Sequence, residues 1–315
     1  MTASGFDSQV GYAVETVSGT YTAPTKTIEH VKASLGLEID RIISKGIKAG
    51  RRHQGRWFAG TQRVKGQIVH ELGVQGLTTL MKQAMGSQVD TGAGPYVHTY
   101  IPGAAVESQT LTVQVNKPDE AGTNRVFSYT GMQVTSLEIS SKVGEIAQLA
   151  IDFYGQNLDV AQTLAAAAYP ATWSPFTFVH GTCTIAAVAY EFDDMNFKID
   201  NGLQVDRYTH RATNPSRPKL SKEANFRTFT GTLNSDMFDL TTLNRFIAGT
   251  EAALVFTFTS GATAILTITC NVRFDGNDPE ITGADMTKLS LPFTAISTTS
   301  DAAACTIVVT NSDAT

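Results

Sequence analysis

Apolar and polar residues alternate along several short stretches of the chain. Residues 35–40 read LGLEID, residues 110–115 read TLTVQV, and residues 195–200 read MNFKID. Residues 149–153 repeat the pattern, with Leu, Ile and Phe at every second position. Alternation of this kind places apolar side chains on one face of a strand and polar side chains on the other. The sequence therefore predicts a mainly β protein with half-buried strands.

Two short segments carry a helical pattern instead. LTTLMKQAMG spans residues 77–86, and LTTLNRFIAG spans residues 240–249. In the first copy, apolar residues recur at positions i, i+3, i+4 and i+7, and Gly86 stands where a C-terminal cap is expected. Each copy is predicted to form a short amphipathic helix that packs against a sheet.

The residues that precede the two helices are also similar. Aligning RVKGQIVHEL (63–72) with RTFTGTLNSDM (227–237) places Gly66 opposite Gly231 and Ile68 opposite Leu233. Internal similarity at this spacing predicts one structural unit that is used twice. The predicted fold is thus two tandem β units, each with one short flanking α-helix.

Composition shifts along the chain suggest where the two units begin and end. The first residues mix Gly, Ser and Thr with scattered aromatics, an alanine run closed by Pro170 and Pro175 lies near the middle, and the last residues are small and mostly polar. The predicted boundaries are an N-terminal arm (1–26), a first unit (27–155), a linker (156–175), a second unit (176–297) and a C-terminal tail (298–315).

Each unit also contains a long basic segment. Residues 44–62 are interrupted by four glycines, and residues 207–226 are interrupted by prolines. Loops of this length are uncommon in compact domains unless they are functional, so we predict that both are docking loops for neighbouring subunits. Their candidate contact residues are Lys45, Lys48, Arg51, Arg52, Arg56, Arg211, Arg217, Lys219 and Lys222.

A nucleic-acid contact is the competing interpretation of these cations. Eight basic residues lie between positions 41 and 65, with no acid among them, and would attract phosphate. However, the segment has little aromatic interleaving for base stacking and no recognisable reader motif, and the whole chain has a net charge of −5. These observations favour a protein contact.

Overall composition is consistent with a protein that contacts other protein molecules. Charged residues make up 17% of the 315 residues, below the roughly 25% that is typical of soluble domains. No run approaches the roughly 20 consecutive apolar residues of a membrane helix, and residues 1–26 lack the layout of a signal peptide. We therefore expect no membrane association and synthesis in a cytoplasm.

Known catalytic and metal-binding patterns are missing from the sequence. The six histidines have no metal-ligand spacing, and no nucleophile elbow, phosphate loop or dinucleotide fingerprint occurs. Cys183, Cys270 and Cys305 lie far apart and form no CxxC motif, so they are predicted to be small buried side chains. The sequence thus predicts no enzyme, no catalytic residue, no metal and no cofactor.

Several longer stretches carry a family resemblance. They are GYAVETVSGTYTAPTKTIE, LEIDRIISKGIKAGRR, KGQIVHELGVQGLTTLMKQAMG, FTGTLNSDMFDLTTLNRFIAGT and RFDGNDPEITGADMTKLSLPF. Together they resemble the tail tube (major tail) proteins of long-tailed, non-contractile bacteriophages, in the form that contains two domain copies. The resemblance covers most of the chain and rests on the order and spacing of the stretches.

The resemblance implies a β-sandwich or barrel unit with one flanking helix, whose sheets join side by side into a ring. Rings stack into the tail tube of the virion, around a channel for genome passage, and duplicated members form trimeric rings with pseudo-sixfold symmetry. The implied partners are other copies of the chain, tail terminator and tail-tip proteins, and the tape measure protein and DNA in the lumen, without sequence-specific binding. The loops 44–62 and 207–226 and the arm 1–26 match positions of ring-to-ring contact.

A ring of such units also predicts which side chains face the channel. The apolar faces of the alternating strands must turn into the core of each unit, so the opposite faces meet solvent or the lumen. The predicted lumen-facing acids are Glu38, Asp40, Glu138, Asp152 and Asp200. The alternative is that they are ordinary solubilising charges on the outer surface. An acidic wall would repel passing DNA and leave it mobile, whereas a basic wall would bind it.

The alternative function is that of a carbohydrate- or receptor-binding β module of a virion. Such a module requires a cluster of aromatic side chains on one exposed surface. Trp57 and Trp173 are far apart in the sequence, one in a predicted docking loop and one in the linker. The sequence alone gives no sign of a sugar-stacking platform, although a fold could still bring the two residues together.

Overall fold

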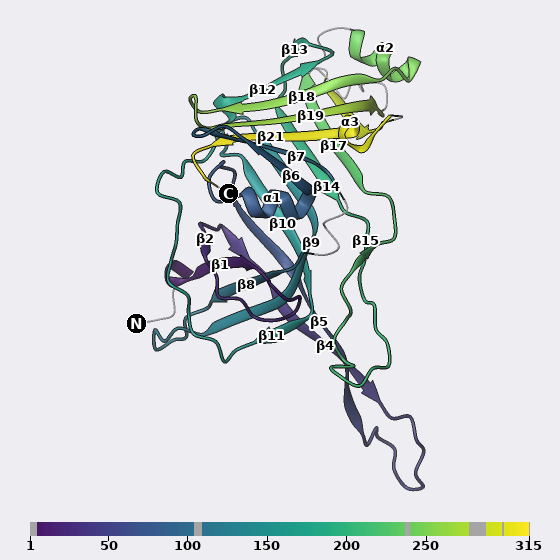
Figure 1. Ribbon diagram of the computed structural model, residues 1–315. Helices are drawn as coiled ribbons and strands as arrows, with labels where there is room; N and C mark the ends of the chain where they lie inside the picture. The colour runs from purple at the N-terminus through teal and green to yellow at the C-terminus, as the bar shows by residue number, and fades with distance from the viewer. Residues whose placement is uncertain (1–4, 104–108, 237–239, 277–287, 298, 315) are drawn as a thin grey trace.

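The computed structural model describes residues 5–103, 109–236, 240–276, 288–297 and 299–314, and most of these lie in β-strands (Figure 1). One extended sheet, termed the main sheet, runs through the molecule in the order β4–β5–β10–β9–β14–β17–β20–β19, with antiparallel neighbours throughout. Its strands are β4 (Gly36–Ile43), β5 (Trp57–Glu71), β10 (Gln148–Gly155), β9 (Val126–Lys142), β14 (Asp194–Asp200), β17 (Thr228–Asp236), β20 (Lys288–Ala295) and β19 (Ile265–Phe274).

Strands β10 and β14 of the main sheet have one buried face and one polar face, as predicted, whereas on β4 Leu37 is only half-buried and Ile39 is exposed. On β10, Leu149 and Ile151 are fully buried, and Asp152 points to the opposite face. On β14, Phe197 is fully buried between Asn196 and Lys198. Because Phe197 pairs with buried Ile139 of β9, the same face is apolar across the junction of the two halves.

A second, smaller sheet packs against the first half of the main sheet. It contains β2 (Lys26–Ile28), β1 (Gln9–Val14), β8 (Leu111–Asn116), the first part of β9, and β11 (Asn157–Asp159), in that order. Strand β9 belongs to both sheets and links them. Its buried side chains join those of β1 and β8 in one apolar core, so the mainly β, sandwich-like fold class is confirmed.

Strand β19 joins further strands from both halves of the chain. On one side lie β18 (Ala252–Thr259), β12 (Gly181–Ile185) and β13 (Val188–Tyr190). On the other side lie β21 (Cys305–Asn311), β7 (Tyr96–Pro102) and β6 (Gly86–Thr91). The β6–β7 hairpin of the first half therefore extends the sheet of the second half, which Figure 1 shows at the top.

The two helices of the LTTL repeat form, but they are buried to different extents. Helix α1 (Thr78–Met85) ends at Gly86 and α2 (Thr241–Ala248) ends at Gly249, and both glycines adopt left-handed φ angles of 88° and 60°. This conformation is one that glycine adopts without steric cost. The apolar face of α1 is buried, whereas α2 buries only Thr242 and Leu243, so the prediction of a core-facing helix holds fully for α1 alone.

The structure differs from the predicted N-terminal arm and C-terminal tail. Within 1–26, β1 is a central strand of the smaller sheet, with Val10 and Tyr12 buried. Within 298–315, a short helix α3 (Asp301–Ala304) leads into β21, where Ile307 is fully buried between β19 and β7. Both segments alternate over only six or seven residues, and the small polar residues around them obscured the pattern.

The predicted linker, 156–175, lies along the smaller sheet. After β11, the amide of Thr27 donates to the carbonyl oxygen of Ala168 at 3.0 Å, and the Gln9 side chain donates to the carbonyl oxygen of Ala165 at 3.0 Å. The remaining short elements are η1 (Gly5–Asp7), β3 (Lys32–Ala33), η3 (Phe178–His180), β15 (Leu203–Gln204) and β16 (Lys222–Glu223).

Candidate assembly surfaces

Strands β4 and β5 continue beyond the body of the molecule as a projecting hairpin (Figure 1). We call residues 41–58 the arm; they are distinct from the N-terminal arm that was predicted at residues 1–26. Its strands pair as far as Ile43 and Trp57, so the connecting loop covers residues 44–56 and is shorter than the predicted 44–62. The reason is that the apolar pairs Ile43–Trp57 and Ile42–Phe58 continue the ladder, because aromatic and β-branched pairs stabilise antiparallel strands.

The arm carries an exposed apolar surface that the pattern of basic residues and glycines did not predict. Ile42, Trp57 and Phe58 are each more than half exposed, and Ile47 is completely exposed. The guanidinium carbon of Arg41 lies 4.6 Å from the ring centre of Trp57 and covers part of it. Exposed apolar groups concentrated on one projecting element mark a protein contact surface. The adjacent Trp57 and Phe58, opposite Ile42 and Ile43, were the signal in the sequence.

The predicted docking cations of the first loop are placed along the arm. Lys45, Lys48, Arg52 and Arg56 are exposed, whereas Arg51 is half-buried and donates to the carbonyl oxygen of Gly46 at 3.0 Å. Because the arm has no acidic residue, it combines apolar side chains with a uniformly positive charge.

Acidic residues hold the base of the arm. Arg63 on β5 lies 3.1 Å from Glu38 and 2.9 Å from Asp40, both on or beside β4. Asp40 also accepts a hydrogen bond from the Thr61 hydroxyl at 2.6 Å. The Thr61 hydroxyl and the Arg63 guanidinium hold the pKa of Asp40 below its ordinary value of 3.8. Hydrogen bonds and ion pairs across the two strands thus fix the direction in which the arm leaves the sheet.

The second predicted docking loop folds back onto the first half of the chain. The amide of Gln62 donates to the carbonyl oxygen of Ser216 at 2.7 Å, and the hydroxyl of Tyr208 donates to the carbonyl oxygen of Gln62 at 3.0 Å. The structure therefore brings the two loops together at the base of the arm. This contact joins residues about 150 positions apart, which no local pattern could reveal.

The cations of the second loop differ in their surroundings. Arg211 donates to the carbonyl oxygens of Asn214 and Arg217 at 2.9 and 2.8 Å, so its guanidinium closes the loop internally. The Arg217 side chain is half-buried, and Lys219 and Lys222 are exposed. The second loop thus presents fewer free cations than the arm.

The five predicted lumen-facing acids lie on or beside one face of the main sheet. Glu138, Asp152 and Asp200 alternate with buried residues on three different strands. Glu38 pairs with Arg63 across β4 and β5, and Asp40 contacts the same Arg63. Asp152 accepts hydrogen bonds from Gln67 at 3.1 Å and from Ser136 at 2.6 Å. Strand alternation places the basic residues Arg63, Lys65, Lys142, Lys198 and Lys288 on this polar face as well.

Strand β4 has an open outer edge. Its inner edge pairs with β5, and no described strand pairs with the other edge. Strand β14, in contrast, is paired on both edges, with β9 and with β17. An unpaired edge presents a row of backbone donors and acceptors that can pair with another strand.

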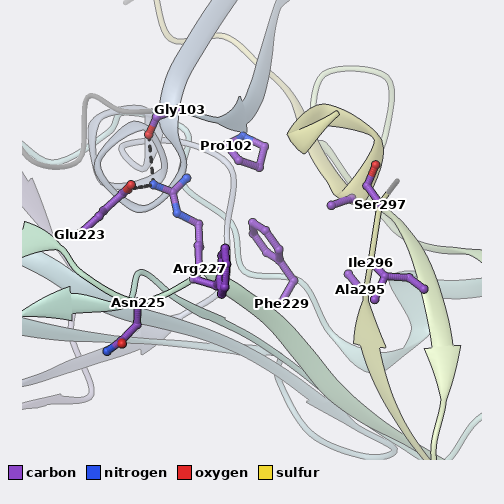
Figure 2. A pocket seen from close by; sticks show the side chains of 11 residues that line it. Pro102, Gly103, Glu223, Asn225, Arg227, Phe229, Ala295, Ile296 and Ser297 are labelled. Carbon is purple, nitrogen blue, oxygen red and sulfur yellow. Dashed lines mark hydrogen bonds and ion pairs between the residues drawn. The ribbon is translucent and has the colours of Figure 1, made fainter. Parts of the chain in front are cut away.

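Arg227, which lies at the C-terminal end of α1, makes an internal contact. Figure 2 shows Arg227 pointing toward Gly103 and Glu223 in a pocket that Phe229, Pro102 and Ile296 also line. Its guanidinium donates to the carbonyl oxygens of Met85 at 2.8 Å and Gly103 at 3.0 Å, and pairs with Glu223. A cation at the C-terminal end of a helix is favoured by the helix dipole. Arg227 therefore ties the second half to the last turn of α1.

No group of three or more metal-ligating side chains occurs in the parts of the chain that the structure describes, and none of its described helices could span a membrane. All three cysteines are buried free thiols, as predicted. Trp57 lies on the arm, and Trp173 packs against Gly73 beyond the other end of β5. A strand of this length spans roughly 45 Å, so the two tryptophans do not form a sugar-stacking platform.

An open strand edge, a projecting arm and a broad polar face are features of a subunit that associates with other protein copies. Comparison with protein families gives a match to the phage tail tube protein over residues 5–295, and the chain belongs to this family. It is therefore a structural component of a virion tail that assembles into a tube. No match was found among curated proteins.

Proposed function

We propose that three copies of this chain close into a ring of six β units and that such rings stack around a channel for genome passage. The observation that carries the proposal is the β9–β14 junction, where the sheet of the first half continues into the sheet of the second. We interpret that junction as a contact between two similar units inside one chain. The same kind of contact between chains would close a ring.

The proposed duplication is supported by matching positions in the two halves. The main sheet has the order β4–β5–β10–β9 in the first half and β14–β17–β20–β19 in the second. Gly66 of β5 pairs with Phe153, and Gly231 of β17 pairs with Phe293. A Cβ at Gly231 would meet the Phe293 ring, so the glycine makes room for the aromatic side chain. Each second strand is followed by an LTTL helix with a left-handed glycine cap.

In the proposed ring, one end of the main sheet of each copy pairs with the other end of the main sheet in the next copy. Strand β14 pairs with β9, whereas the matching edge of β4 is open. We propose that the β4 edge of one copy pairs with the next copy at the β19–β20 end of its main sheet, where Arg273 and Phe274 lie beyond the last residue of β19 that pairs with β18. Six units from three chains then give closed symmetry, and the open edge of β4 gains a partner.

The polar face of the main sheet is proposed to line the channel. The buried face is covered by the smaller sheet, α1 and the strands around β19, so only the polar face is available to the lumen. Its carboxylates, including Glu138, Asp152 and Asp200, would repel phosphate and so offset the attraction of DNA to the lysine and arginine side chains of the same face. We further propose that the tape measure protein occupies this channel before the DNA, and that the terminator and tail-tip proteins bind the two tube ends.

Stacking of rings is proposed to use the arm. Its apolar side chains Ile42, Ile47 and Phe58 would be buried against the next ring. Its cations would attract an acidic surface on that ring. Electron microscopy of the purified protein tests the function. Tubes or stacked rings are the expected result. Discrete particles at all concentrations, with binding to glycans, would instead support a carbohydrate-binding module.

A further inference from the structure

We infer that the second basic loop, residues 205–221, is a brace for the arm and not a second docking loop, so that each ring offers three arms to the next ring. This inference rests on the proposed function. It departs from the expectation that two duplicated units present two equivalent loops. We call residues 205–221 the brace.

The brace is anchored on strands of the first half at several points. The Asp206 carboxylate accepts a hydrogen bond from the Tyr154 hydroxyl at 2.9 Å, and the amide of Asp206 donates back to the same hydroxyl at 3.0 Å. Asp206 has a φ of 56°, a conformation that aspartate tolerates better than most residues. Its carboxylate also lies 3.7 Å from the Arg63 guanidinium at the base of the arm.

The other end of the brace is anchored on β9 and on the residue that follows β10. Gln133 of β9 accepts from the amide of Ser221 at 2.8 Å and donates to its carbonyl oxygen at 3.3 Å. Gln156 donates to the carbonyl oxygen of Pro218 at 3.1 Å, and Pro218 is buried. Between these anchors, the Gln62 contacts with Tyr208 and Ser216 hold β5 where it leaves the body of the molecule.

Internal hydrogen bonds close the brace on itself. Besides the Arg211 contacts, the Arg207 guanidinium donates to the carbonyl oxygen of Leu220 at 2.7 Å, and the amide of Lys219 donates to the carbonyl oxygen of Arg207 at 2.8 Å. A loop closed in this way and anchored at both ends keeps a fixed shape. It can therefore fix the direction of the arm, which by itself is a two-stranded hairpin of marginal stability.

The occupant of the arm's contact surface is a second copy of this chain. The arm holds six cations, Arg41 included, and no acid; removing these six from the 24 basic residues leaves 18 against 29 acids. The rest of the chain therefore has a net charge of −11 and is complementary to the arm. The side chains of Ile42, Ile47 and Phe58 are exposed to solvent, so covering them with a neighbouring copy would add hydrophobic stabilisation to the contact.

Two charge-reversal variants separate the arm from the brace. Lys48→Glu with Arg52→Glu changes two exposed arm residues, and Lys219→Glu with Lys222→Glu changes two exposed residues in and beside the brace by the same charge. Tube formation is measured by sedimentation and electron microscopy over a range of salt concentrations. We expect the arm variant to lose at least tenfold in sedimented tube and the brace variant to assemble like the unmodified chain. Equal loss in both variants would overturn the inference while leaving a tube-forming protein.

A second measurement does not depend on tubes. Tyr208→Phe removes the hydroxyl that bonds to Gln62, and Tyr96→Phe on β7 is the matched control. Amide hydrogen exchange is followed in the unassembled protein. We expect exchange at Gln62 to become roughly three- to tenfold faster in Tyr208→Phe, and to be unchanged in the control, because a typical hydrogen bond contributes about 1 kcal/mol. Unchanged exchange at Gln62 would show that the brace does not hold the arm and would overturn the inference.

Discussion

Glu15 is a buried carboxylate that connects the segment after β1 to the smaller sheet. It accepts hydrogen bonds from the hydroxyls of Thr110 and Thr112 at 2.6 and 3.0 Å, and from the amides of Gly131 and Gly19 at 2.8 and 2.6 Å. Burial raises its pKa above the ordinary value of 4.5, and these hydrogen bonds oppose the shift only in part. The carboxylate therefore satisfies four donors but is costly to ionise in this position.

Replacing Glu15 with Ala is expected to destabilise the protein by roughly 1–3 kcal/mol, because the amides of Gly131 and Gly19 would be left without an acceptor. The measurement is denaturant unfolding, with Glu29→Ala at an exposed position as the control. A cost no larger than that of the control would show that water replaces the carboxylate without loss.

The cost of Glu15→Ala is also expected to depend on pH. Because the pKa of Glu15 is raised in the folded state, its stabilising contribution is fully present below pH 4.5 and decreases as pH rises through the folded-state value. The difference in unfolding free energy between wild type and variant should therefore be larger near pH 4 than at pH 7. A difference that grows with pH would mean that hydrogen bonding to the ionised form outweighs burial.

Among the elements, β21 shows most clearly what the sequence pattern could and could not predict. The sequence predicts strands β4, β10 and β14 because apolar and polar residues alternate clearly there and charged residues mark the polar face. The pattern in β21 covers seven residues after an alanine run, and its meaning depends on pairing with β19 and β7. Likewise, the contact between Gln62 and the brace joins segments that are distant in the sequence. The sequence therefore predicts which cations belong to the two loops, but it does not predict that those of the second loop are more enclosed than those of the arm.

The Ile307→Ala substitution tests the role of β21. Ile307 is fully buried between two strands, so its truncation is expected to reduce the free energy of unfolding by about 2–5 kcal/mol. Val308→Ala, at a less buried neighbouring position of the same strand, is the control and should cost less. Equal and negligible costs would mean that residues 305–311 behave as a free tail in solution.

For the whole molecule, the proposed channel lining predicts how an assembled tube would interact with DNA. Glu138→Lys combined with Asp200→Lys reverses two charges of this face, and Glu29→Lys with Glu120→Lys reverses two exposed charges elsewhere. We expect tubes of the first variant to retain double-stranded DNA at low salt and to release it as salt rises. Tubes of wild type and of the control variant should retain much less DNA. Equal retention by both variants would argue that Glu138 and Asp200 do not line the channel.

The central claim is that two units in one chain occupy neighbouring positions of a six-unit ring. Its most direct test is a reconstruction of the assembled tube by electron microscopy, in which the chains of one ring are counted and traced. We predict three chains per ring, with β4 of each chain beside the β19–β20 end of the next and the carboxylates of Glu38, Asp40, Glu138, Asp152 and Asp200 on the inner wall. A ring of six full-length chains, or a main sheet that faces outward, would contradict the account.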